Sequence, residues 1–194
     1  MNKIGEIVES GSSAFTAECY ELHNIPALGS LVKVTGQETD IFGIVCQAGT
    51  AGIEPGRHPV ARGKDETSEE AVYQSSPQLL KLLRSEFQVL VVGQKTSGRI
   101  LQYLPAKPAH IHAFVYPCDS AEVKEFSRSF DFLNILVNNR LEIPTEDLTA
   151  AALREMSKEQ TDPRAFLVGG GKALTSILSG DYRRLKAILA RLKQ

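Results

Sequence analysis

The clearest strand pattern in this chain is Ala14-Phe15-Thr16-Ala17-Glu18-Cys19-Tyr20. Phe15, Ala17 and Cys19 alternate with Thr16, Glu18 and Tyr20. Such alternation is typical of a strand with one buried face and one solvent-exposed face. Short runs rich in β-branched residues lie on either side and predict three more strands, at residues 4–8, 30–34 and 41–45. Because turn residues separate these short runs, the pattern favours an antiparallel barrel or sandwich over a parallel sheet.

The remaining barrel strands are predicted further along the chain. Ser76 and Pro77 are typical of a helix start, and the apolar face of that short helix would be Leu79, Leu80, Leu82, Leu83 and Phe87. Residues 89–93 predict a buried strand, and we expect the barrel to close with this strand and another at residues 98–102. Two prolines within residues 104–108 then predict an extended exit from the barrel.

A long loop is predicted over residues 49–74. Glycine, proline and charged residues dominate it, so it has little to bury. A loop of this length inside a compact domain is usually functional or disordered. It is therefore the first place to look for contact with a partner, and a plain surface insertion is the alternative.

Helices are predicted from Asp119 onward. Asp119 or Ser120 can cap a helix together with Glu122, and an apolar stripe follows at steps of three and four residues: Val123, Phe126, Phe130, Leu133 and Val137. We expect this stripe to pack on the barrel; a groove for a partner helix is the alternative. Pro144 marks a boundary, after which helices are expected at residues 145–158, 172–179 and 181–194.

These elements predict an α+β fold, a small closed antiparallel β-barrel followed by helices. The expected divisions are a barrel with its loop at residues 1–118, a packing or linking helix at 119–143, and a helical C-terminal region at 144–194. On this division, residues 1–144 are expected to fold without the rest of the chain.

Charge and cysteine content narrow the function classes. Lys and Arg total 22 against 23 Asp and Glu, so the net charge of -1 gives no overall field that would attract phosphate or membrane. The three cysteines are odd in number and widely spaced, which indicates a reducing compartment. No stretch approaches the roughly 20 apolar residues that span a bilayer. We expect a cytoplasmic protein without a membrane span.

Chemistry-bearing motifs are scarce. His110 and His112 are weak metal candidates, because on a strand both would face one side, but the same residues suit an edge strand with its polar face outward. Residues 166–173 resemble a phosphate loop, yet Phe166 and Ala173 stand where that motif needs glycine and Ser or Thr. Since no nucleophile motif appears either, we expect no cofactor and no enzymatic activity.

The last predicted helix is amphipathic and basic. Its apolar face comprises Tyr182, Leu185, Ile188, Leu189 and Leu192. Five basic residues lie mostly off that face and are the candidate contacts for an acidic partner or nucleic acid: Arg183, Arg184, Lys186, Arg191 and Lys193. A membrane surface is another target for such a helix, and a solvated face on a small helical bundle is the plain alternative.

The N-terminal pattern resembles the HAS barrel, a module shared by HerA-type DNA translocases and rotary ATP synthase subunits. The resemblance rests on residues 4–8, 14–18, 26–32, 40–45, 101–105 and 108–112, and it covers roughly residues 1–130. In HerA-like proteins the barrel precedes an ATPase domain, for which this chain is too short. The barrel of these relatives lies at one end of a hexameric ring and contacts subunits or partners. The resemblance therefore implies a stand-alone barrel with a docking role and without ATP hydrolysis.

The leading functional expectation is a non-catalytic interaction or assembly module that docks on a larger complex, with a multi-subunit ring ATPase as the partner class. A homo-oligomer is compatible with this role. The alternative is a nucleic-acid-associated accessory factor that uses the basic C-terminal helix. An apolar or mixed patch on the barrel rim would favour the first, and basic residues gathered on one face with an aromatic would favour the second. An enzyme would need His110, His112 and an acid in one pocket.

Overall fold

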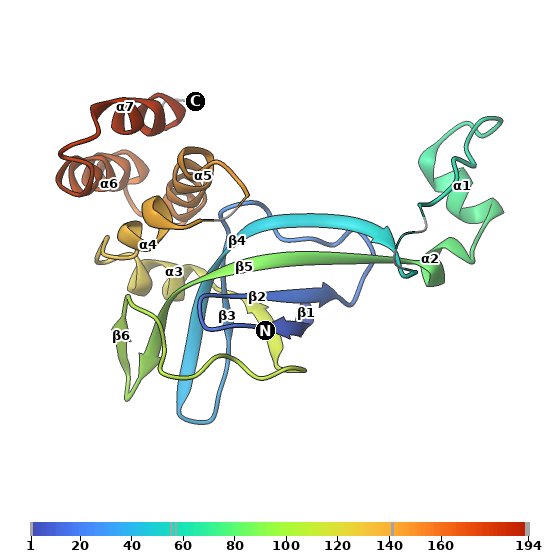
Figure 1. Cartoon of the computed structure of the whole chain (residues 1–194), viewed down its shortest axis with the longest axis horizontal. Helices are drawn as coiled ribbons and strands as arrows, with labels where there is room; N and C mark the ends of the chain where they lie inside the picture. The colour runs from blue at the N-terminus through green and yellow to red at the C-terminus, as the bar shows by residue number, and fades with distance from the viewer. Residues whose placement is uncertain (1, 55, 57, 141, 193–194) are drawn as a thin grey trace.

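Six strands form a closed antiparallel β-barrel, which the computed structural model shows in Figure 1. The structure describes residues 2–54, 56, 58–140 and 142–192. The barrel strands are β1 (Gly5–Ser10), β2 (Ala14–Cys19), β3 (Leu31–Val34), β4 (Thr39–Gly52), β5 (Leu83–Thr96) and β7 (Phe114–Pro117). They follow the order β2-β1-β7-β3-β4-β5, and the pairing of β5 with β2 closes the ring. The predicted α+β class with a closed barrel is confirmed.

The barrel interior is filled by the apolar positions of its strands. Phe15, Ala17 and Cys19 of β2 are all buried there, as their alternation predicts. Their neighbours in this cluster are Ile7, Val32, Val34, Ile41, Val45, Phe87, Val89, Val91 and Val115. Gly43 of β4 lies where the inner face has no spare room, because a Cβ there would approach Val89 Cγ1 to 2.2 Å. The barrel is therefore a packed core rather than an open tube.

The two longest strands also bury their outer faces. Phe42, Ile44 and Cys46 of β4 belong to a second apolar cluster, as do Leu90 and Val92 of β5. Five helices supply the other side of this cluster: α3 (Ser120–Phe126), α4 (Leu133–Asn138), α5 (Thr145–Lys158), α6 (Pro163–Ile177) and α7 (Tyr182–Arg191). Strands covered on both faces read as continuous apolar runs, which explains the unbroken hydrophobicity of β4 and β5 in this region.

The helices beyond Pro144 share this second core with the barrel. Gly29, whose φ is +87°, packs so closely on α5 that a Cβ there would lie 2.5 Å from the carbonyl carbon of Ala151. Leu153 of α5 and Ile188 of α7 are fully buried in the same cluster as the outer-face residues of β4 and β5. The C-terminal region and the barrel thus bury one another. No helix in the described ranges is long and apolar enough to cross a membrane.

The segment after Asp119 forms two helices, so the prediction of one continuous helix is wrong. The predicted capping box is present: Asp119 accepts the Glu122 N–H at 2.9 Å, and Glu122 accepts the Asp119 N–H at 3.1 Å. However, α3 ends at Phe126. The side-chain amide of Gln102 donates to the Phe126 carbonyl at 2.6 Å and accepts the Phe132 N–H at 2.9 Å. Gln102 therefore satisfies backbone groups that a continuous helix would have paired.

The predicted C-terminal helices are found, with one corrected start. The bounds predicted for α5 are those observed, residues 145–158. In contrast, α6 begins at Pro163 rather than at residue 172. Asp162 caps α6 by accepting the Ala165 N–H at 2.9 Å, and Pro163 takes the first helical position. This cap-and-proline pair is a known start signal that the sequence interpretation overlooked.

The predicted barrel closure is half right: the strand that contains residues 89–93 closes the ring, but the second closing strand expected at residues 98–102 does not. This second strand is β6 (Arg99–Leu101), which pairs with β5 outside the closed ring. Ser97 and Gly98, both at positive φ, turn the chain back along the edge of β5. Closure depends instead on β5 pairing with β2, and on β7 lying between β1 and β3. These pairings join strands that are far apart in sequence.

Beyond the barrel, β4 and β5 continue as a protruding hairpin, which we call the arm (residues 47–86; Figure 1). It ends in two short helices, α1 (Glu69–Ser75) and α2 (Leu79–Leu82). The predicted loop at residues 49–74 is therefore wrong at both ends, which are strand and helix. The short helix predicted after Pro77 is present as α2, but its extension over Leu83 and Phe87 is wrong, because both residues belong to β5 and Phe87 fills the barrel.

Candidate functional site: the arm and the basic helical end

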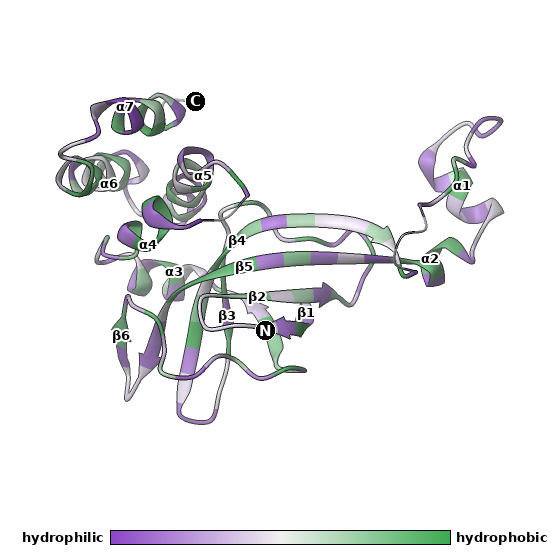
Figure 2. Cartoon of the chain, in the orientation of Figure 1, coloured by the Kyte–Doolittle hydropathy of each residue, from purple (hydrophilic) through white to green (hydrophobic). Residues whose placement is uncertain are grey.

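The tip of the arm carries exposed apolar side chains. Val60 is 76% exposed, and Ile53, Leu80 and Leu82 are also exposed. A cleft of about 130 Å³ at this tip is lined by Gly52, Ile53, Glu54, His58, Pro59, Val60, Arg62, Leu79, Leu82 and Leu83. Figure 2 shows the hydrophobic α2 standing away from the barrel core. An apolar cluster this far from the protein's own core is a candidate partner site.

A polar network fixes the arm to the barrel. His23, which has a φ of +65°, donates its backbone N–H to Ser85 Oγ at 2.9 Å. Its ring Nε2 lies 2.7 Å from the hydroxyl of Tyr73, and the two rings meet edge to face at a centroid distance of 5.8 Å. Since Tyr73 belongs to α1 and His23 precedes β3, this contact joins the tip helix to the barrel body.

The same network does not have the geometry of a nucleophile and its base. Ser85 Oγ is shared between the His23 backbone N–H and Thr50 Oγ1, which lies 2.7 Å away, and Ser85 is only 1% exposed. The His23 ring uses Nδ1 toward Thr50, at 3.4 Å, and Nε2 toward Tyr73. A triad would need the ring to take the serine proton. The arrangement therefore serves to position the arm.

The cysteine thiols are also poor nucleophiles. Cys19 and Cys46 are buried and free, and burial raises the pKa of each thiol to about 11. Burial likewise raises the pKa of Cys118 far above its ordinary value. Because the thiolate is the reactive form, all three side chains stay protonated and unreactive at neutral pH.

His110 and His112 lie in a turn rather than on a strand. His112 has a φ of +67°, and its Nδ1 lies 2.8 Å from Glu6 Oε1. This hydrogen bond, with a second from Tyr20, lowers the pKa of Glu6. Among the described residues, no three His, Cys, Asp or Glu side chains are grouped as metal ligands. The interpretation of residues 109–113 as an edge strand is wrong, since β7 begins at Phe114.

His110 instead borders a wide cleft at one end of the barrel. This cleft has a volume of about 890 Å³ and lies between the β3–β4 turn, residues 35–38, and the exit segment, residues 105–110. The exit segment is irregular, as its prolines predict. The titratable residues among the described lining of the cleft are Glu38, Lys107 and His110, and the structure gives no hydrogen bond or ion pair between their side chains.

Two of the predicted basic contacts are used inside the fold. Arg184 donates from Nε to Glu146 at 2.9 Å and from Nη2 to the Val137 carbonyl at 2.5 Å. Arg191 donates from Nε to Asp147 at 2.6 Å. Burial acts to raise the pKa of Glu146, but hydrogen bonds from its backbone and Arg184 outweigh this and lower it. Both arginines thereby pin α7 to α5.

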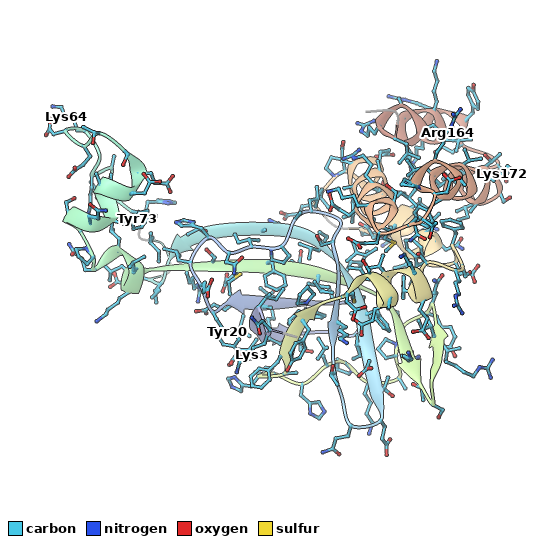
Figure 3. The ribbon with its side chains drawn as sticks, turned by 180° about the vertical axis from the view of Figure 1, so that it is seen from behind. Lys3, Tyr20, Lys64, Tyr73, Arg164 and Lys172 are labelled. Atoms are coloured by element: carbon cyan, nitrogen blue, oxygen red, sulfur yellow. The ribbon has the colours of Figure 1, made fainter. Side chains whose placement is uncertain are left out.

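Other basic residues of the C-terminal end face solvent. Arg183 and Lys186 of α7 are exposed, and so are Arg164 and Lys172 of α6. Figure 3 shows Arg164 and Lys172 at the opposite end of the molecule from Lys64 and Tyr73 of the arm. The remaining candidate, Lys193, lies outside the described residues. We call α6 and α7 together the basic helical end.

The glycine-rich segment within α6 is helical. Gly169, Gly170 and Gly171 all lie inside the helix, and Gly170 faces Leu153 of α5, where a Cβ would come to 2.9 Å. A phosphate loop would need these residues in an open turn before the helix. Their role is close helix packing.

Neither family models nor curated proteins supply a relative of this chain. The chain matches no protein-family model. A search of curated proteins likewise finds no significant match.

Proposed function

We propose that this protein is a non-catalytic docking module whose arm binds a protein partner in a larger complex. The observation that carries the proposal is the exposed apolar cluster at the arm tip: Ile53, Val60, Leu80 and Leu82. Three of the four, Ile53, Val60 and Leu82, line the cleft. The charged Glu54 and Arg62 line it as well, and an apolar centre with a charged rim is typical of a protein interface. The polar network of His23 and Tyr73 supports this role, because a pre-positioned arm loses less entropy on binding.

The proposed partner class is a multi-subunit ring ATPase in the cytoplasm. The closed six-stranded barrel is compatible with the HAS barrel, whose relatives contact subunits at one end of a ring. Three free thiols support a reducing compartment. The protonated thiols and the shared Ser85 hydroxyl support a module without catalysis.

Site-specific photocrosslinking in the native organism tests the partner directly. A photoreactive residue at Val60 of the arm is expected to capture a subunit of a ring ATPase, identified by mass spectrometry. The matched control carries the photoreactive residue in place of Ile111, which is exposed on the barrel side. Capture of the same subunit from both positions would contradict docking through the arm.

A paired substitution tests the energetics. The variant V60D/L80D is expected to lose the crosslinked partner while its melting temperature stays the same, because both side chains are exposed. The control I111D should keep the partner. Full retention of the partner by V60D/L80D would refute the proposed function.

A further inference from the structure

The basic helical end carries positive charge that the rest of the fold compensates only in part. The sequences of α6 and α7 contain six basic residues and no acidic residue. Two of the six, Arg184 and Arg191, are neutralised by Glu146 and Asp147 of α5. Within the described part of the chain, the structure gives no hydrogen bond or ion pair to the side chains of the other four: Arg164, Lys172, Arg183 and Lys186.

All four cations are exposed, and they belong to two helices that pack on each other. Helix α6 packs on α7, where a Cβ on Gly171 would lie 3.3 Å from Leu189. At about 100° per residue, Arg164 and Lys172 lie within one quadrant of α6. Lys186 follows Tyr182 by one turn on α7, so these two side chains are surface neighbours. Leu174 of α6 and Leu185 and Ile188 of α7 are buried in the bundle, whereas all four cations are exposed.

An exposed aromatic ring lies beside these basic side chains. Tyr182 is 75% exposed and stands beside Arg183 in sequence and Lys186 on the helix surface. A tyrosine ring flanked by cations offers a stacking platform for an unpaired base and contacts for its phosphates. Duplex bases are already stacked and would leave the ring unused.

An anionic lipid surface is a less suitable ligand for the basic helical end than nucleic acid. An interfacial helix inserts its apolar face into the bilayer boundary. On α7 that face is Leu185 and Ile188, which are buried against the bundle. Insertion would require α7 to leave α5 and break the ion pair of Arg184 with Glu146. Contact with nucleic acid uses only side chains that already face solvent.

We propose that the basic helical end binds single-stranded nucleic acid through Arg164, Lys172, Arg183 and Lys186, with Tyr182 stacking on a base. This surface is separate from the arm and does not depend on the function proposed for it. Four phosphate contacts predict a slope of log K against log salt near -3 for a single strand. Binding should therefore be measurable at low salt and weak at physiological salt.

Fluorescence anisotropy with labelled oligo(dT) and the full chain tests the proposal. The variant R164Q/K172Q/R183Q/K186Q is expected to lose binding and to flatten the salt slope, while its melting curve stays unchanged. The matched control K64Q/K81Q/R99Q/K107Q removes four other exposed cations and should bind as the wild type does. Equal loss in both variants would overturn the site, because the effect would then reflect net charge.

Tyr182 separates nucleic acid from other polyanions. Tyr182→Ala should weaken oligo(dT) binding about tenfold, whereas Tyr182→Phe should retain it. Failure of the wild type to bind oligo(dT) between about 50 and 200 mM salt would overturn the proposal. Binding to phosphatidylserine vesicles without binding to oligo(dT) would also overturn it.

Discussion

At the scale of single residues, the packed barrel interior leaves little room for a side chain at Gly43. A methyl group there would meet Val89 Cγ1 at 2.2 Å inside the closed barrel. Gly43→Ala is expected to lower the free energy of unfolding by about 1–3 kcal/mol, as overpacking does. Gly49→Ala is the control, because no atom lies within 4 Å of its Cβ position. Urea unfolding of both variants measures the difference, and equal stabilities would show that the barrel yields at Gly43.

His23 is the residue on which the position of the arm tip depends. His23→Ala is expected to speed amide hydrogen exchange in α1 about two- to tenfold, the effect of losing one hydrogen bond to Tyr73. Tyr73→Phe should reproduce part of this change, because the ring contact remains. His110→Ala is the control. Unchanged exchange in α1 for His23→Ala would show that the network does not hold the arm.

At the scale of elements, α7 carries two neighbouring arginines with different roles. Arg184 contacts Glu146 and the Val137 carbonyl, whereas Arg183 faces solvent. Arg184→Gln is expected to cost about 1–3 kcal/mol of unfolding free energy at neutral pH, and Arg183→Gln less than about 0.5 kcal/mol. Replacing all basic residues of α7 together would therefore confuse binding with stability.

The ion pair of Arg184 with Glu146 should also depend on pH. The pKa of Glu146 is lower in the folded protein than in the unfolded chain, so its carboxylate stabilises the fold above the unfolded pKa. That contribution is lost as the pH falls through the lowered, folded pKa. The free energy of unfolding of the wild type and of Arg184→Gln should be measured at neutral and at acidic pH. The difference between the two proteins is expected to be smaller at acidic pH. A constant difference would exclude the carboxylate as its source.

The helical state of α6 predicts that ATP does not bind there. Residues 169–171 have their backbone N–H groups directed along the helix, so they cannot surround a phosphate. Calorimetric titration of the full chain with ATP should show no saturable heat. A micromolar site that disappears in Lys172→Ala would contradict this prediction.

At the scale of the whole molecule, the core that the barrel shares with the C-terminal helices makes independent folding of residues 1–144 less favourable. Removing α5, α6 and α7 exposes the outer faces of β4 and β5 together with α4, all of which lie in one apolar cluster. This fragment is expected to melt at a lower temperature and to bind a hydrophobic dye. Replacing residues 53–82 by an Asn-Gly turn should leave the barrel melting nearly unchanged, because the arm lies outside both cores. The opposite ranking of the two deletions would contradict the shared core.

Local signals in the sequence determined much of the barrel and the helices. Alternation identified the interior residues Phe15, Ala17 and Cys19, since the period of a strand belongs to the backbone itself. The capping box of Asp119 and the bounds of α5 follow from side chains within a few residues of one another. Such features do not depend on residues that are distant in sequence.

Tertiary structure alone decided the closure of the barrel, the arm and the division of labour within α7. Closure joins β2 to β5, and the helix break after Phe126 depends on Gln102, so both rest on partners remote in sequence. Arg183 and Arg184 are identical in chemistry, and they differ only in tertiary contacts: Glu146 and the Val137 carbonyl accept hydrogen bonds from Arg184. The sequence by itself showed a basic amphipathic helix, but which cations remain free depends on where other elements place their carboxylates.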